Sequence, residues 1–184
     1  KMFERGQEGL NRALGIIDKL LVYSRRPAQE FVPVDVTALV QDTLELIAYP
    51  LNSASVRIEQ QIEPALRVLG RPQELQQVLV NLILNALQAV AEQEARRKII
   101  LIRGWLENGE VKLEIHDRGQ GISATDLERI FEPFFTTKPV GKGTGLGLSI
   151  SHQIVDLHRG KLEVSASDAQ GSTFRITLPA DKQK

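Results

Sequence analysis

The spacing of apolar side chains predicts that the chain begins with a helix. Within residues 3–26, Phe3, Leu10, Leu14, Ile17 and Leu21 are separated by seven, four, three and four residues, and Ser24 follows three residues later, in the heptad pattern of a coiled coil or helical bundle. Leu20 and Val22 widen this stripe, which favours a bundle helix that pairs with another chain over a two-stranded zipper. A single amphipathic helix folded against its own domain is the alternative.

Beyond Pro27 the pattern changes between helical and strand-like segments. Apolar positions with helical spacing predict helices over residues 36–53, 71–93, 124–131 and 146–158, the first with Asp35 as its N-cap. Alternation of apolar and polar positions predicts strands over residues 56–62, 66–70, 98–108, 110–117, 161–167 and 172–179. Asn108-Gly109 is a hairpin signal. Because hairpins and helices mix without a βαβ repeat, the pattern predicts an α+β domain: one mostly antiparallel sheet covered on one face by about three helices.

Composition adds a set of exclusions. The 184 residues are 42% hydrophobic and 25% charged, as in a soluble globular protein with a real core. The absence of cysteine excludes disulfides and a thiol nucleophile and suits a reducing, cytoplasmic location. Zero net charge argues against nucleic acid or an anionic membrane as partner. No apolar run reaches about 18 residues, so nothing in this sequence is expected to span a bilayer. The opening Lys-Met-Phe looks like the middle of a helix, so we expect a piece of a larger protein whose other parts could include membrane spans.

The long helix predicted over residues 71–93 carries amide side chains on an apolar background. Asn81 and Asn85 are four residues apart, so both project from one face, one turn apart. Buried amides need hydrogen-bond partners, and neighbouring backbone groups are one possible source. The functional interpretation is that their oxygens bind a Mg²⁺ ion held mainly by phosphates and water.

A carboxylate and two glycines follow one predicted strand, as Asp117-x-Gly119-x-Gly121. Glycines let a backbone approach a flat ligand closely, and a carboxylate accepts a hydrogen bond from an exocyclic amine such as that of adenine. A turn capped by Asp117 explains the same residues about as well.

Two further segments suggest a loop that covers a ligand. In FEPFFTTK, residues 131–138, the phenylalanines would anchor the loop and Thr137 and Lys138 would face the ligand, although a core-plus-turn explanation remains open. In GKGTGLGLSI, residues 141–150, glycines precede a helix, an arrangement that exposes N–H groups to phosphate. Neither the P-loop pattern nor G-x-G-x-x-G fits these glycines.

In this order, the asparagine pair, the Asp117 motif, FEPFFTTK, GTGLGLSI and the GSTF of residues 171–174 resemble the catalytic, ATP-binding domain of sensor histidine kinases. These kinases share the Bergerat fold with gyrase-, Hsp90- and MutL-type ATPases. The resemblance covers about residues 31–180, and the wording of FEPFFTTK and NLILNALQA is similar to the nitrogen-regulation sensor class. The preceding helix, ending in LLVYSRRP, resembles the second helix of a dimerisation and histidine phosphotransfer domain. Residues 1–28 are therefore expected to belong to that domain and residues 29–184 to the catalytic domain.

The resemblance implies a set of nucleotide-binding residues. Asn85 would hold Mg²⁺ on the ATP phosphates with support from Asn81, and Asp117 would bind the adenine amine with help from Thr173. Lys138 and Lys142 would neutralise phosphate charge from a lid whose hinge is the glycine-rich segment. The full implied set is Asn81, Asn85, Asp117, Gly119, Gly121, Ile122, Lys138, Lys142, Gly143, Thr144, Gly145, Leu146, Gly147 and Thr173. Many relatives have Lys or Arg where this chain has Gln88, so that phosphate contact must come from elsewhere.

The resemblance also implies a reaction: transfer of the γ-phosphoryl group of ATP to a histidine, then to an aspartate of a response-regulator receiver domain. His116, His152 and His158 lack the flanking pattern of a phosphoacceptor, so we expect all three to be structural. The chain then supplies no catalytic residue of its own and does not autophosphorylate alone. The implied partners are ATP, the receiver domain and the protein's own dimerisation domain, in a homodimer, without nucleic acid or membrane contact.

Two other functions remain open at the level of sequence. An ATP-driven clamp or DNA-topology ATPase has the same fold, but usually carries a glutamate general base where this chain has Asn81. A non-catalytic dimerisation module with a vestigial site is the second alternative, and the intact Asp117, Asn85 and glycines argue against it.

Overall fold

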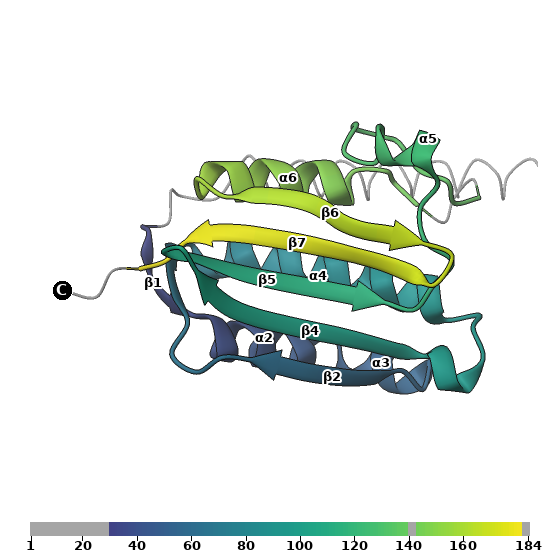
Figure 1. Ribbon diagram of the computed structural model, residues 1–184, viewed down its shortest axis with the longest axis horizontal. Coiled ribbons are helices and arrows are strands. Elements are labelled where there is room, and N and C mark those ends of the chain that lie inside the picture. Colours follow the sequence, from purple (N-terminus) through teal and green to yellow (C-terminus); the bar gives the residue numbers. More distant parts are fainter. Residues whose placement is uncertain (1–29, 140–142, 182–184) are drawn as a thin grey trace, which may run out of the picture.

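The computed structural model describes residues 30–139 and 143–181 (Figure 1). The predicted heptad helix over residues 3–26 and the domain boundary near residue 28 lie outside these ranges. Among the described residues, no helix is both long and apolar enough to cross a membrane. The elements are β1 (Val32–Asp35), α2 (Val36–Leu46), α3 (Ala48–Ser53), β2 (Arg57–Ile62), β3 (Arg67–Gly70), α4 (Pro72–Val90), the 3₁₀ helix η1 (Ala95–Arg97), β4 (Ile99–Glu107), β5 (Glu110–Asp117), α5 (Ala124–Leu127), α6 (Gly147–Leu157), β6 (Lys161–Asp168) and β7 (Gly171–Pro179).

Five strands form the main sheet in the order β2-β4-β5-β7-β6. The neighbours β4–β5, β5–β7 and β6–β7 are antiparallel, whereas β2 and β4 are parallel. Helices α2, α4 and α6 lie together on one face of this sheet (Figure 1). The prediction of an α+β domain with a mixed, mostly antiparallel sheet covered by about three helices is confirmed.

Helix α4 is the central element of the core. It begins with Pro72, whose missing N–H costs nothing in the first turn of a helix. Its apolar positions recur every three or four residues and face the sheet, where each buried side chain contributes roughly 1.5–3 kcal/mol. The buried α4 side chains are Leu75, Val78, Leu79, Leu82, Ile83, Ala86, Leu87 and Val90.

The helix expected over residues 36–53 is two helices in the structure. Asp35 caps the first as predicted, since its Oδ1 accepts a hydrogen bond from the Ala38 N–H at 2.9 Å. The helix ends at Leu46, and Ile47 leaves helical geometry with φ −108° and ψ 19°. Pro50 explains the break, because it cannot donate to the Leu46 carbonyl and its ring crowds that group.

One predicted strand exists in the structure but pairs with a strand outside the main sheet. The strand predicted over residues 66–70 does not join the main sheet; it pairs as β3 with β1 in a separate two-stranded sheet. Alternation of side chains shows which face is buried but not which strand lies alongside.

The hairpin prediction is confirmed: Asn108 and Gly109 have φ of 55° and 79°, as a type I′ turn requires.

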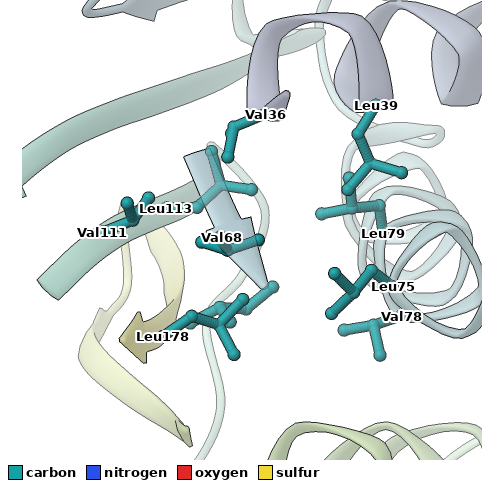
Figure 2. A pocket seen from close by; sticks show the side chains of 10 residues that line it. Val36, Leu39, Val68, Leu75, Val78, Leu79, Val111, Leu113 and Leu178 are labelled. Carbon is teal, nitrogen blue, oxygen red and sulfur yellow. The ribbon is translucent and has the colours of Figure 1, made fainter. Parts of the chain in front are cut away.

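A small cavity of about 20 Å³ lies in the core between α2, β3, α4 and the sheet (Figure 2). Val36, Val68, Val78 and Val111 are among the side chains that line it, and all of the lining residues are apolar. It lies near the start of β5, the end of that strand opposite Asp117. We regard it as a local packing imperfection, because it offers a ligand no polar group.

Candidate functional site

The Asp117 loop, residues 117–123, follows β5. The Asp117 side chain is only 3% exposed. Its Oδ1 accepts hydrogen bonds from the Gly119 N–H at 2.7 Å and the Ser172 N–H at 3.4 Å. Burial raises the pKa of the Asp117 carboxyl above its ordinary 3.8, and the two backbone hydrogen bonds oppose that rise. The loop therefore holds a buried carboxylate in one orientation, with one oxygen used to fix the backbone.

The glycines of this loop permit two close backbone approaches. A Cβ added to Gly119 would lie 2.7 Å from the Ala89 Cβ on α4. Gly121 has a φ of 76°, and a Cβ there would lie 1.9 Å from the carbonyl oxygen of Asp168, the last residue of β6. Ile122 is fixed through its N–H, which donates to the Ser167 hydroxyl at 2.7 Å. The structure thus places Gly119, Gly121 and Ile122 in the same closely packed loop as Asp117.

The structure does not place the Thr173 side chain beside Asp117. In the β5–β7 register Asp117 is opposite Ser172, and His116 is opposite Thr173. Because side chains alternate between the faces of a sheet, Thr173 lies on the far face, where its hydroxyl is 2.9 Å from His116 Nδ1. Ser172, 4% exposed, shares the face of Asp117. The residue predicted from the sequence is therefore the neighbour of the one that lies opposite Asp117. Because neighbouring residues of a strand point to opposite faces, Thr173 lies on the other face of the sheet from Asp117.

Lys138 and Asn85 are brought together, although they are far apart in sequence. The Lys138 Nζ donates to Asn85 Oδ1 at 3.3 Å and also contacts Gln88 Oε1. Burial lowers the pKa of the Lys138 ammonium. A positive charge from residues 131–139, which we call the Lys138 segment, therefore lies against the amide face of α4, including position 88.

Asn81 is used to hold two helices together. Its Nδ2 donates to the Ser151 hydroxyl at 3.0 Å. A Cβ added to Gly147, the first residue of α6, would lie 2.1 Å from Asn81 Oδ1. Among the described residues, no side-chain hydrogen bond caps this end of α6. Asn81 thus fixes an uncapped helix N-terminus close to the amide face of α4.

The Lys138 segment is anchored by two phenylalanines and not by three. Phe131 and Phe135 pack against the core, whereas Phe134 is 64% exposed. Phe134 has a φ of 68°, and its N–H donates to the Gly145 carbonyl at 2.9 Å. A Cβ on Gly145, whose φ is 67°, would lie 2.3 Å from the Phe134 carbonyl carbon. The glycine-rich segment thus folds back onto FEPFFTTK.

The remaining predicted residues of this region have smaller roles in the structure. A Cβ on Gly143 would meet the Thr136 hydroxyl at 2.7 Å. The Thr144 hydroxyl accepts a long hydrogen bond of 3.5 Å from the N–H of Leu146, whose side chain is buried. Lys142, also predicted to contact phosphate, lies outside the described residues.

Three contributors to this site were not predicted from the sequence. Ser172 and Ser167 fix the Asp117 loop, and Arg97 donates to the Gly119 carbonyl at 2.9 Å. Ser172 lies in the GSTF motif beside the residue that was predicted, so the motif marked the right place. No motif or spacing identifies Ser167 or Arg97, because their partners are backbone groups far away in sequence.

The donor set suits a metal ion that arrives with a polyphosphate. Among residues 30–139 and 143–181, no group of three or more His, Cys, Asp or Glu could hold a metal ion. The Asn85 oxygen already faces a cation, the Lys138 ammonium. A single neutral amide oxygen is enough for Mg²⁺ when phosphates and water supply its other ligands.

Comparison with known proteins places this geometry in a family. Residues 70–182 match the family described as histidine kinase-, DNA gyrase B- and HSP90-like ATPase. The two-component sensor PprA of Pseudomonas aeruginosa is 38% identical over 183 residues, covering 96% of this chain and 19% of PprA. The sensor histidine kinase ZraS of Escherichia coli is 34% identical over 173 residues, covering 94% of this chain and 35% of ZraS. This chain therefore spans only about a fifth to a third of these relatives.

Solved structures agree in fold and in sequence. The catalytic domain of histidine kinase ThkA, in a nucleotide-free form, superposes with a TM-score of 0.73 at 30% identity, covering 82% of this chain and 96% of that domain. ThkA in complex with the response regulator TrrA matches with a TM-score of 0.77 at 27% identity, covering 96% of this chain and 50% of the ThkA chain. The family match includes α4, the Asp117 loop and the glycine-rich segment. By this match, and by a fold shared with histidine kinase catalytic domains, the chain belongs to the histidine kinase-, DNA gyrase B- and HSP90-like ATPases.

Proposed function

We propose that this chain binds Mg²⁺-ATP between the Asp117 loop and the Lys138 segment. The observation that carries the proposal is that one face of α4 contacts both: Ala89 meets Gly119, and Asn85 and Gln88 meet Lys138. Positions 85, 88 and 89 are neighbours on a helix surface. A buried carboxylate and a partly buried ammonium are thus arranged along one side of α4, as a nucleotide with a base at one end and phosphates at the other requires.

Each end has a distinct role in this proposal. Asp117 accepts a hydrogen bond from the adenine amine, and Ser172, in place of Thr173, lies on the same face of the sheet. Lys138 leaves Asn85 and Gln88 and binds phosphate oxygens. Its ammonium then supplies the positive charge that many relatives have as Lys or Arg at the position of Gln88. Asn85 would hold a Mg²⁺ ion on the nucleotide, which would neutralise charge that develops on the phosphates during transfer.

We further propose that the intact protein is a sensor histidine kinase of a two-component system. The relatives that match most of this chain are named as sensors and sensor kinases, and the solved ThkA complex contains a response regulator. In the reaction, a histidine nitrogen of the dimerisation domain forms a bond to the γ-phosphorus of ATP and loses its proton. The bond from that phosphorus to the bridging oxygen breaks, and ADP leaves. The chain's own contribution is to position the nucleotide.

The contacts of the three histidines support a phosphoacceptor on another part of the protein. His158 Nε2 accepts from the Arg71 N–H at 3.0 Å, and its Nδ1 is 2.7 Å from the Ile154 carbonyl oxygen. His116 contacts Thr173, and His152 Nδ1 is 3.0 Å from Asp156 Oδ2. In this proposal residues 1–28 belong to the dimerisation domain of a homodimer, which acts in the cytoplasm and passes its phosphoryl group to a receiver domain.

The contacts of Asn81 argue against an ATP-driven clamp. A clamp that hydrolyses ATP needs a general base to activate water. Asn81 is an amide engaged with Ser151, and an amide cannot accept that proton. Steady-state ATP hydrolysis by the 184-residue chain would favour the clamp over the kinase.

Calorimetric titration of the 184-residue chain with ATP tests the binding proposal. We expect binding that weakens without Mg²⁺, and that weakens strongly in Asp117→Asn and Asn85→Ala variants that remain folded. Binding unchanged in both variants would refute the assignment. In the intact protein, Asp117→Asn should also abolish incorporation of acid-labile phosphate from labelled ATP.

A further inference from the structure

Arg97 connects two loops through backbone carbonyl groups alone. It is the last residue of η1, between α4 and β4. Its Nε donates to the Arg118 carbonyl at 3.1 Å. Its Nη2 donates to the Gly119 carbonyl at 2.9 Å and, more weakly, to the Ala169 carbonyl at 3.4 Å. The Arg97 guanidinium therefore donates hydrogen bonds both to the Asp117 loop and to the turn between β6 and β7.

These two loops already meet backbone to backbone. A Cβ on Gly121 would lie 1.9 Å from the Asp168 carbonyl oxygen, and one on Gly171 would lie 1.9 Å from the Asp117 carbonyl oxygen. Arg97 adds a contact from a third segment of the chain, because it donates to the Arg118 and Gly119 carbonyl groups of the Asp117 loop.

Arg97 and Asp117 act on opposite sides of the same short backbone segment. The Gly119 N–H donates to the Asp117 carboxylate at 2.7 Å, while the Gly119 carbonyl accepts from Arg97 at 2.9 Å. With both of its polar groups held, Gly119 cannot rotate to present a different hydrogen-bonding pattern. A guanidinium suits this task because its donors form a rigid planar fork and its charge strengthens each bond.

We propose that Arg97 is a positioning residue that sets the preference of the site for adenine over other bases. It acts through Gly119: by fixing the loop, it keeps the Asp117 carboxylate oriented as an acceptor for an amine. This inference rests on the proposed function, because it assumes that the base lies against Asp117. Arg97 itself need not contact the nucleotide.

The neighbouring residue provides a matched control. Arg96 has the same side chain and lies in the same 3₁₀ helix, but its side chain is 81% exposed and its Nε pairs with Glu94 at 2.8 Å. It contacts neither the Asp117 loop nor the turn between β6 and β7 in the described residues. A general effect of removing a positive charge from η1 would appear in both Arg96→Ala and Arg97→Ala.

The test compares the dissociation constants for ATP and GTP in the 184-residue chain and its variants. GTP carries the same phosphates but presents an oxygen where adenine presents its amine, so Asp117 discriminates against it. In Arg97→Ala we expect ATP binding to weaken about tenfold and GTP binding to change little, so the ratio of the two constants falls about tenfold. In Arg97→Lys, which keeps the charge without the planar fork of donors, the ratio should fall about threefold. In Arg96→Ala the ratio should not change.

The outcomes separate this inference from the proposed function. If Arg97→Ala keeps the wild-type ratio, or weakens both nucleotides equally, Arg97 has only a structural role and the inference is wrong. Should Arg97→Ala fail to fold, Arg97→Lys and Arg97→Gln decide by the same ratio. A wild-type chain that binds ATP in an Asp117-dependent way while the Arg97 variants keep the ratio overturns this inference alone. A wild-type chain that does not bind ATP overturns the proposed function, and this inference with it.

Discussion

The Asp117 loop and the Lys138 segment are held in place by different kinds of contact. Backbone atoms fix the Asp117 loop: Gly119 and Ser172 donate N–H groups to the carboxylate, and Arg97 binds the carbonyls. The Lys138 segment is anchored to the core by Phe131 and Phe135, but its charged group is held only by side-chain contacts, those of the Lys138 ammonium with Asn85 and Gln88. Backbone contacts cannot be exchanged without moving the chain, whereas a lysine can change partners by rotating its side chain.

This difference suggests a division of labour. A site that must recognise one base benefits from a pocket that is fixed before the ligand arrives, because the cost of ordering the pocket is met during folding. A site that must bind and release phosphates benefits from a cation that already has weak, replaceable partners. The Asp117 loop should therefore tolerate almost no substitution, whereas the Lys138 segment should tolerate several.

The largest effect is expected at the buried carboxylate. Asp117→Asn removes the charged acceptor, and ATP binding should weaken about 100-fold by calorimetry. The nucleotide-free protein should not lose stability at pH 7, because burial raises the pKa of Asp117 and its ionised form opposes folding.

The pH dependence of stability gives this prediction its sign. With a raised folded-state pKa, the stability contributed by protonated Asp117 is fully present below 3.8 and is lost as the pH rises through the raised value. The midpoint of thermal unfolding of Asp117→Asn should therefore exceed that of wild type near pH 7 and approach it towards pH 3.8. A variant that is less stable than wild type at pH 7 would show that the carboxylate is a structural requirement.

The second effect contrasts two glycines. At Gly121 a Cβ would strike backbone in a loop with positive φ, so Gly121→Ala should lower the free energy of unfolding by about 2–3 kcal/mol. At Gly143 the nearest atoms belong to the Thr136 and Lys138 side chains, which can move, so Gly143→Ala should cost less than about 1 kcal/mol. Urea unfolding of both variants measures the difference; equal losses would contradict the contrast between the two ends.

A smaller effect is expected at the lysine. Lys138→Met should weaken ATP binding about fivefold and leave adenosine binding unchanged, since only the phosphate contact is lost. Lys161→Met is the control, because Lys161 pairs with Glu163 on β6, away from α4. A matching loss of adenosine affinity in Lys138→Met would mean that the Lys138 segment also supports the base.

The smallest effect concerns the core, away from both ends. Val78→Ile adds one methylene beside the small cavity and should raise the free energy of unfolding by about 0.5 kcal/mol, with no change in ATP affinity. Thermal unfolding and calorimetry on the same sample check both statements. A change in ATP affinity would show that the cavity is coupled to the site along α4.

The sequence was informative where local chemistry determines structure. Helix α4, the Asp35 cap and the Asn108-Gly109 turn follow from periodicity, capping and φ preference, which act within a few residues. The break at Ile47 was also readable, since Pro50 marks it, but the apolar spacing across it suggested one helix. The fold class followed because these local signals agreed with one another.

Contacts between segments that are distant in sequence could not be predicted. The register of β7 against β5 decides whether Ser172 or Thr173 shares the face of Asp117, and neither strand alone contains that information. Likewise, the partners of Arg97 are carbonyl groups, which are present at every residue and carry no signal in the sequence. The motifs therefore selected the residues of the candidate site, whereas the geometry of that site depends on contacts between distant segments.

The shared face of α4 limits how this chain can change. Asn85, Gln88 and Ala89 meet their partners only because they are three and four positions apart on a helix. One residue more or fewer between Asn85 and Ala89 would rotate one contact by about 100° away from the other. Substitutions within α4 are therefore compatible with this arrangement, whereas insertions and deletions are not. In the proposed complex the helix fixes the spacing between the Asp117 loop and the Lys138 segment, and any variation in length has to be accommodated in the loops on either side of it.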